Sequence, residues 1–138
     1  NSNEKVYPFA ENLDEFINFH GRLDGDLKYS VYSDSHVLIL PSYTEGLPNV
    51  YCEALASGNP IIITKVGAIP DYFEHKKQGF LLKTIPPSPT EIYFYVKYLL
   101  NKRESMKKIS EYNRSFSKKF DSSLVSKEIE NIYFEILN

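Results

Sequence analysis

An alternation of apolar runs with one helical pattern, near the middle of the chain, restricts the fold more than any other feature. The run His36–Leu40 and the β-branched run Pro60–Thr64 are typical of buried strands. Between them, Leu47–Ser57 has helical spacing and ends at Gly58, a residue type common at helix C-termini. Strand–helix–strand segments of this kind form parallel strands joined by right-handed crossovers.

Further elements are predicted on both sides of this unit. They are a short strand at Phe16–His20, a helix at Leu27–Ser33 capped by Asp26, at most one helical turn at Asp71–Glu74, and a strand at Gly79–Leu82. Ser88 to Glu91 fits a capping box, and three runs of apolar residues at helical spacing follow, between 92 and 136. The sequence therefore predicts an α/β fold, a Rossmann-like parallel sheet flanked by helices, with a helical C-terminal third.

Size and composition narrow the class of protein. The 138 residues suffice for one domain, and the polar, weakly patterned opening NSNEKVYPFAEN suggests a start inside a longer protein. We therefore expect a single, truncated domain over 1–138 with its C-terminal helices in 84–138. The net charge of −2 argues against nucleic acid as a partner. Cys52 is the only cysteine, and no Cys/His group has zinc spacing. No apolar run reaches the ~18 residues of a membrane span, and the start does not resemble a signal peptide.

Charge is unevenly distributed along the chain. Residues 1–64 hold three basic and nine acidic side chains, a net of −6, whereas residues 65–138 hold thirteen and nine, a net of +4. The densest basic stretch is Lys97–Lys119, where tyrosines lie beside lysines. Two interpretations stay open for this stretch: a solvated helical face, or a surface that meets anionic lipid.

Two carboxylates occupy positions that suggest a ligand. Glu45 lies in a Gly/Pro-bearing loop, and Glu53 lies on the apolar helix that follows, where an unpaired charge is costly to bury. Helix N-termini favour anions, so this junction suits a phosphate. Eight helical residues rise ~12 Å, which places Glu53 about two turns into the helix and separates the carboxylates too far for an acid/base dyad. The pair suggests one ligand with hydroxyls and phosphate.

Three glycine-containing loops are expected to border this ligand. In open parallel sheets, ligands bind beyond the carboxyl ends of the strands. The loops Gly21–Leu23, Ser42–Leu47 and Lys65–Ile69 each follow a predicted strand. Glycine in such loops allows the backbone to approach a ligand closely.

The segment Ser42–Phe73 has a motif order that resembles a known family. It reads SYTEGLPNVYCEALASGNPIIITKVGAIPDYF: two glutamates with seven residues between them, an Ala-x-Ala-x-Gly-x-Pro turn, a strand, and a Gly-x-x-Pro loop. It resembles the nucleotide-sugar signature of retaining glycosyltransferases with the GT-B fold, closest to the family 4 group that builds bacterial polysaccharides. The likeness runs from about Phe16 through Leu82.

The resemblance implies a role for each matching residue. Glu45, the catalytic candidate, would contact the transferred sugar near the reacting carbon, and Glu53 would accept hydrogen bonds from ribose hydroxyls. The remaining donor-binding candidates are Gly46, Leu47, Asn49, Val50, Gly21, Arg22 and Gly67. The donor would be a UDP-, GDP- or ADP-sugar, and the family usually needs no metal and no other cofactor. Activated sugar donors are cytosolic, so we expect a cytoplasmic protein, with peripheral contact at the inner membrane face.

The chain also departs from the family pattern. Family members place an Arg and a Lys on the diphosphate from a loop upstream of the Phe16–His20 run, and this sequence has no room for that loop. The N-terminal acceptor-binding domain, which would hold a glycan or lipid-linked acceptor, is also missing. We therefore expect that the fragment alone does not turn over donor. An apolar stripe in the last helix, Leu124 to Ile136, predicts self-association.

Alternatives remain open at this point. Glu45 could be a plain loop carboxylate, and Glu53 a solvent-facing helix residue. Asp24-Gly-Asp26 matches an Asp-x-Asp metal motif, but a turn with a helix cap explains it more simply. Besides the glycosyltransferase, the chain could be a GT-B sugar-nucleotide epimerase, or a non-catalytic module that only binds a sugar nucleotide or assembles a complex.

Overall fold

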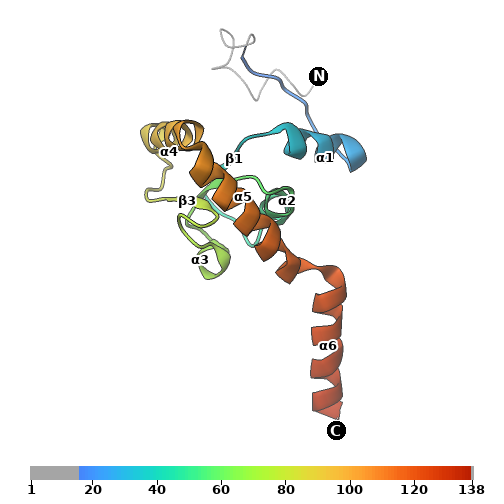
Figure 1. Ribbon diagram of the computed structural model, residues 1–138. Helices are drawn as coiled ribbons and strands as arrows, with labels where there is room; N and C mark the ends of the chain where they lie inside the picture. The colour runs from blue at the N-terminus through green and yellow to red at the C-terminus, as the bar shows by residue number, and fades with distance from the viewer. Residues whose placement is uncertain (1–15, 138) are drawn as a thin grey trace.

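The computed structural model describes residues 16–137, and residues 1–15 and 138 lie outside this description. The elements follow in the order α1 (Gly25–Asp34), β1 (Leu38–Leu40), α2 (Asn49–Ser57), β2 (Ile61–Thr64), α3 (Ile69–Tyr72), β3 (Gly79–Leu82), α4 (Pro89–Asn101), α5 (Arg103–Ser117), a 3₁₀ turn (Lys118–Phe120) and α6 (Ser122–Leu137). Strands and helices alternate up to β3, and helices alone follow (Figure 1).

The three strands form one parallel sheet in the order β1-β2-β3. Leu38 of β1 aligns with Ile61 of β2, and Ile61 aligns with Gly79 of β3. All four residues of the central strand β2 are buried, as expected for a strand covered on both faces. The α/β class and the parallel pairing expected from the sequence are confirmed.

Helices cover both faces of the sheet. On one face, Ile61 and Ile63 pack with residues of α2, with Ile69 of α3 and with Phe116 of α5. On the other face, Ile62 joins a cluster of buried residues made of Phe80, Leu82, Leu99 and Ile109, from β3, α4 and α5. Because side chains alternate along a strand, β2 contributes to both clusters.

Helix α2 has the end that the sequence predicts. Gly58 is its C-cap with φ +82°, a left-handed conformation that glycine adopts without strain. Its N–H donates to the carbonyls of Ala54 and Leu55, and the Asn59 N–H also donates to the Ala54 carbonyl at 2.9 Å. The side chain of Arg114, on α5, donates to the Ser57 carbonyl at 3.1 Å and ties the same helix end to α5.

Four local expectations need correction. Phe16–His20 forms no strand, because it lies outside the three-stranded sheet and so lacks the hydrogen-bonding neighbour that a strand requires. Helix α1 begins at Gly25, with Asp24 and not Asp26 as its N-cap, and the Asp24 side chain pairs with Arg22 instead of capping. Strand β1 is shorter than expected and only partly buried, because it is an outer strand with a neighbour on one side only.

The fourth correction concerns the capping box at the start of α4. The Ser88 hydroxyl accepts from the Glu91 N–H at 3.3 Å, as expected. The Glu91 carboxylate, however, accepts from the Lys83 N–H and from the Tyr95 hydroxyl instead of returning to Ser88. Glu91 therefore links α4 to the residue that follows β3.

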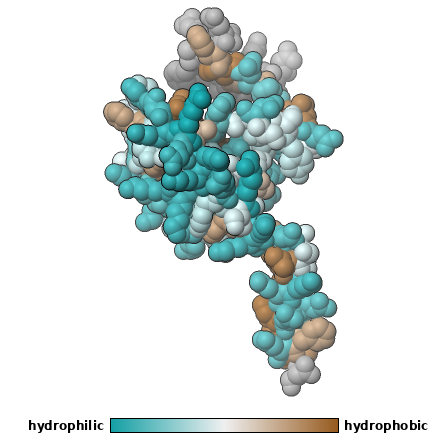
Figure 2. Space-filling view, viewed as in Figure 1, coloured by the Kyte–Doolittle hydropathy of each residue, from teal (hydrophilic) through white to brown (hydrophobic). Residues whose placement is uncertain are grey.

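Helix α6 projects away from the body of the molecule (Figure 1). None of its described residues is buried, and Figure 2 shows hydrophobic side chains on it. The exposed apolar residues include the predicted stripe of Leu124, Val125, Ile129, Ile132 and Ile136. The stripe is therefore open to solvent in this structure.

Candidate functional site

The loop between β1 and α2 holds Glu45 in a defined orientation. The Ser42 hydroxyl donates a hydrogen bond to Oε1 of Glu45 at 2.7 Å, and the Glu45 side chain is partly buried. Strand β1 ends just before this loop, so Glu45 lies at the carboxyl edge of the sheet, as predicted. One carboxylate oxygen is thus fixed by Ser42, and no hydrogen bond is recorded for Oε2 among the described residues.

The loop after β2 packs directly onto the Glu45 loop. Gly67 has φ +56°, and a Cβ at this position would lie 1.8 Å from the Glu45 carbonyl oxygen. The Ala68 N–H donates to the Gly46 carbonyl at 3.2 Å. The structure therefore brings together Glu45, Gly46 and Gly67, three residues that the sequence assigned to one site.

The N-terminus of α2 faces the same edge of the sheet. Pro48 is the N-cap, and Asn49 and Val50, which begin the helix, are exposed. The first N–H groups of a helix have no partner within the helix and carry the positive end of its dipole. An anion at this edge would therefore meet free donors of α2 beside Glu45.

Glu53 is held by two side chains of α1. The Lys28 ammonium donates to Oε1 at 2.7 Å, and the Tyr32 hydroxyl donates to Oε2 at 3.0 Å. The hydrogen bond to Glu53 raises the pKa of Lys28. Burial, followed by the hydrogen bond to Glu53, raises the pKa of Tyr32. Each carboxylate oxygen of Glu53 thus has one donor and keeps capacity for another.

The spacing of the two carboxylates differs from the sequence expectation. Helix α2 begins at Asn49, so Glu53 lies four residues, or just over one turn, into the helix and not about two turns. The residues from Glu45 to Pro48 are a loop, and the ~12 Å rise of a continuous helix does not apply to them. Asn49 and Glu53 share one face of α2, because residues four apart are neighbours on a helix.

Gly21 and Arg22 are not placed at the Glu45 edge by a strand, since no strand precedes them in the described residues. Arg22 is exposed and pairs with Asp24 at 3.0 Å. Gly21 lines a hollow of about 280 Å³ together with Lys28 and Tyr32, the partners of Glu53. Gly21 therefore lies near the two α1 residues that hold Glu53, whereas Arg22 does not line this hollow.

Three side chains of this region were missed by sequence reasoning. Ser42, which holds Glu45, gave no signal of its own. Lys28 and Tyr32 lie four residues apart and thus on one face of α1, so their spacing could have indicated a shared partner. That the partner is Glu53 depends on the packing of α1 against α2, which no local pattern contains.

Metal ligands were not expected, and this stays a prediction. Within residues 16–137, no three His, Cys, Asp or Glu side chains gather in a way that could hold a metal ion. Asp24 and Asp26, the Asp-x-Asp match, lie at the start of α1. None of the described helices is both long and apolar enough to cross a membrane.

Comparison with known proteins identifies the family. The sequence model of the family Glycosyl transferases group 1 matches residues 8–116. Among curated proteins, the chain is similar to sulfoquinovosyl transferase SQD2 of Arabidopsis thaliana, with 30% identity over 132 residues, covering 90% of this chain and 26% of that protein.

Solved structures are similar to this chain in fold. Sucrose-phosphate synthase of Thermosynechococcus elongatus matches with a TM-score of 0.80 and 23% identity, covering 91% of this chain and 31% of that one. HepE of Anabaena, in complex with UDP and glucose, matches with a TM-score of 0.79 and 19% identity, covering 89% of this chain and 33% of that one.

The chain belongs to the family Glycosyl transferases group 1, whose members have the GT-B fold. It spans about a quarter of the length of the curated relative and about a third of the two solved structures. The resemblance seen in the sequence is thus confirmed at the level of family and fold.

Proposed function

We propose that this chain is the donor-binding part of a retaining, family 4 type glycosyltransferase, a hexosyltransferase that takes its sugar from a nucleoside diphosphate. The acceptor would be a glycan or a lipid-linked glycan, in the synthesis of bacterial surface polysaccharide. The observation that carries the proposal is the contact between the Glu45 loop and Gly67, which brings two strand ends and the start of α2 together at one end of the sheet. This edge is where open parallel sheets bind ligands.

In this proposal Glu45 contacts the sugar. Its carboxylate is oriented by Ser42 through one oxygen, and the other oxygen is available for sugar hydroxyls. The backbone N–H groups of Leu47, Asn49 and Val50 would face the sugar and the phosphates. At a helix N-terminus, such donors stabilise the negative charge that develops on a leaving diphosphate.

Glu53 accepts the ribose hydroxyls in the same proposal. Lys28 and Tyr32 each use one lone pair of the carboxylate, so both oxygens can still accept from a ribose diol. The two donors would hold the carboxylate in one orientation before the donor arrives. A fixed acceptor loses less side-chain entropy on binding than a free one.

We further propose that no metal and no other cofactor takes part, and that the diphosphate needs cations from elsewhere in the protein. Lys28 is engaged with Glu53, and Arg22 with Asp24. Lys65, directly after β2, is exposed and could reach a phosphate. A binding site with so few cations would bind a nucleotide sugar but would not stabilise the leaving diphosphate. The 138-residue chain alone is therefore expected to be inactive.

The relatives support the class of donor. HepE was solved in complex with UDP and glucose, and SQD2 is named for transfer of sulfoquinovose. The proposal places the whole protein in the cytoplasm, where activated sugars are made, with an N-terminal acceptor-binding domain and peripheral contact with the inner membrane face.

Two other functions would use the same fold: a non-catalytic sugar-nucleotide or scaffold module, and a sugar-nucleotide epimerase. Calorimetric titration of the chain with UDP, GDP and ADP separates binding from scaffolding, since we expect one nucleotide to bind and the scaffold interpretation expects none. UDP and 2′-deoxy-UDP, or the matching pair for the preferred base, then test Glu53. Loss of one hydrogen bond to a charged group should weaken binding about 10- to 100-fold.

Variants sharpen this titration. Glu53→Gln should bind the ribo- and deoxynucleotides with similar affinity, whereas Glu104→Gln, an exposed carboxylate on α5, should keep the wild-type difference. In a full-length protein that contains this chain, Glu45→Gln should lower kcat far more than it raises KM. Product analysis decides between glycosyl transfer and epimerisation, and an epimerised nucleotide sugar without transfer would refute our assignment.

A further inference from the structure

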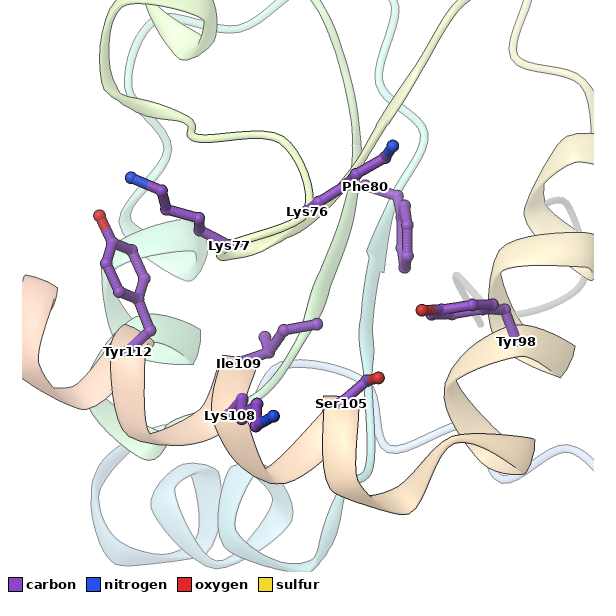
Figure 3. Close-up of a pocket in the computed structure, with 8 residues that line it drawn as sticks. All are labelled: Lys76, Lys77, Phe80, Tyr98, Ser105, Lys108, Ile109 and Tyr112. Carbon is purple, nitrogen blue, oxygen red and sulfur yellow. The ribbon is translucent and has the colours of Figure 1, made fainter.

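A second cavity lies at the end of the sheet opposite to Glu45. It has a volume of about 500 Å³ and lies between β3, α4 and α5 (Figure 3). Its lining residues are Lys76, Lys77, Phe80, Tyr98, Ser105, Lys108, Ile109 and Tyr112. Lys76 and Lys77 precede β3, whereas Glu45 and Gly67 follow β1 and β2, so in a parallel sheet the cavity and the proposed donor-binding loops lie at opposite ends.

The floor of the cavity is apolar and rigid. Phe80 and Ile109 are about 95% buried and belong to the core cluster on this face of the sheet. The Phe80 ring stacks on Tyr95 with centroids 4.3 Å apart and meets the Tyr98 ring edge-on at 5.5 Å. Side chains fixed in this way keep the cavity open at little entropic cost to a ligand.

The rim of the cavity is cationic. Lys76, Lys77 and Lys108 contribute three ammonium groups, which point away from one another in Figure 3, and none of the lining residues is acidic. The backbone of Lys76 has φ +71°, an uncommon conformation for a residue other than glycine, and its N–H donates to the Gly79 carbonyl. Figure 3 shows the Tyr98 and Ser105 hydroxyls beside the apolar floor, where they can donate to a ligand.

Two of the lysines already have acidic partners outside the cavity. Lys77 pairs with Glu74 at 2.6 Å, and Lys108 pairs with Glu104 at 2.9 Å. Both pairs are exposed, and exposed pairs of this kind hold their partners weakly. An anion in the cavity can therefore draw both ammonium groups inward, while Lys76 has no acidic partner among the described residues.

We propose that this cavity binds a phosphate monoester carried on an aromatic or other apolar body. The phosphate would lie at the rim once the flexible lysine side chains turn inward, because ammonium groups bind phosphate as point charges. The apolar body would fill the space over Phe80 and Ile109 and beside the Tyr98 ring. The volume lies in the range of small-molecule sites, which are mostly apolar with a few polar groups.

Phenyl phosphate is the probe for this site, followed by titration of amide NMR signals in the 138-residue chain. We expect saturable shifts at the cavity residues, and weaker binding of inorganic phosphate, which lacks the ring. Lys108→Gln should weaken the binding of phenyl phosphate about three- to fivefold, the size of one exposed charge contact. Circular dichroism checks that the variant is folded.

The matched control is Lys107→Gln. Lys107 is the adjacent lysine on α5 and is also exposed, but it does not line this cavity. The Lys107→Gln variant should bind phenyl phosphate with an affinity within about twofold of that of wild type, because a charge in solvent outside the site is largely screened. No saturable shifts, or equal weakening by the two variants, would overturn the proposal.

A phosphate monoester can come from a free metabolite or from a lipid head group, and vesicles distinguish them. Co-sedimentation is compared for phosphatidylcholine vesicles with and without phosphatidic acid. Sedimentation that depends on phosphatidic acid and on Lys108 but not on Lys107 identifies a lipid source. Binding of phenyl phosphate without such sedimentation identifies a free ligand, and failure of both probes refutes the site.

Discussion

Gly67 and the carbonyl group of Glu45 are in such close contact that a Cβ on Gly67 would lie 1.8 Å from the Glu45 oxygen. Through this contact the loop after β2 packs on the loop after β1. It fixes the backbone of Glu45, the residue proposed to contact the sugar. The Ala68 N–H reinforces it by donating to the Gly46 carbonyl at 3.2 Å.

Gly67→Ala should therefore destabilise the protein and separate the two loops. The left-handed backbone alone costs about 1–2 kcal/mol for alanine, and the steric clash adds to this cost. The control is Gly25→Ala, since Gly25 has φ +59° with no atom within 4 Å of the added Cβ. Urea unfolding measures the free energy of unfolding of both variants. An equal loss of stability in the two would show that the loop contact is unimportant.

The attachment of α1 to α2 should weaken at alkaline pH. Burial and the hydrogen bond to Glu53 raise the pKa of Tyr32 above its ordinary value of 10.0, so folding favours the protonated phenol. Its contribution to stability is then complete below about pH 10 and is lost as the pH rises further. The hydrogen bond to Glu53 also raises the pKa of Lys28, so the contribution of Lys28 to stability is likewise lost as the pH rises.

Tyr32→Phe measures this contribution. The difference in unfolding free energy between wild type and Tyr32→Phe should stay constant from about pH 7 to 9 and shrink above about pH 10. Tyr133→Phe, which removes an exposed hydroxyl on α6, reports the effect of alkaline pH on the rest of the fold. A Tyr32→Phe difference that grows with pH would contradict the assigned sign.

Asn113 should contribute to stability through the nitrogen of its side-chain amide. It is fully buried on α5, and its side-chain amide donates to the Asn59 carbonyl at 2.8 Å and the Gln78 carbonyl at 3.1 Å. The Gln78 carbonyl also accepts from the Ile61 N–H, but no other donor to the Asn59 carbonyl is recorded in residues 16–137.

Asn113→Leu would leave that buried carbonyl without a partner, which costs about 1–3 kcal/mol. Ser115→Ala, an exposed substitution on the same helix, should change stability by no more than about 0.5 kcal/mol. Chemical denaturation measures both variants. An Asn113→Leu protein as stable as wild type would mean that the amide bridge between α5 and the sheet contributes nothing.

How much of this structure the sequence could predict depends on how local the determinants are. Gly79–Leu82 was predicted with its observed bounds, and Ser88 caps α4, because both rest on patterns within a few residues. Phe16–His20 has the composition of a strand, but a strand also needs a neighbour in the sheet, and composition does not supply one.

The candidate site divides in the same way. Glu45, Gly46 and Gly67 could be placed at one edge because strand ends in a parallel sheet share that edge. The partners of Glu53 could not be predicted, since Lys28 is 25 positions away in the sequence and contacts Glu53 only because the two helices pack together. The cavity at Phe80 also joins distant segments, and charge counts along the chain indicated only that the region is basic.

The exposed stripe of α6 should cause the chain to associate with itself. Ile129 and Ile132 are each about half exposed, and burying them against a second copy removes apolar surface from water. Ile129→Glu should shift the population toward monomer, whereas Glu128→Gln, on the same helix, should not. Light scattering across a concentration series checks this, and a wild-type chain that stays monomeric at high concentration would contradict it.

The central claim, that the edge formed by the Glu45 loop, the start of α2 and Gly67 binds a nucleotide sugar, is tested most directly by amide NMR. The chain is titrated with UDP-glucose, and with the GDP- and ADP-sugars. We predict saturable shifts at the N–H groups of Leu47, Asn49, Val50 and Gly67, reduced in Gly67→Ala but not in Gly25→Ala. No shifts with any of these donors, or shifts confined to residues away from this edge, would contradict the account.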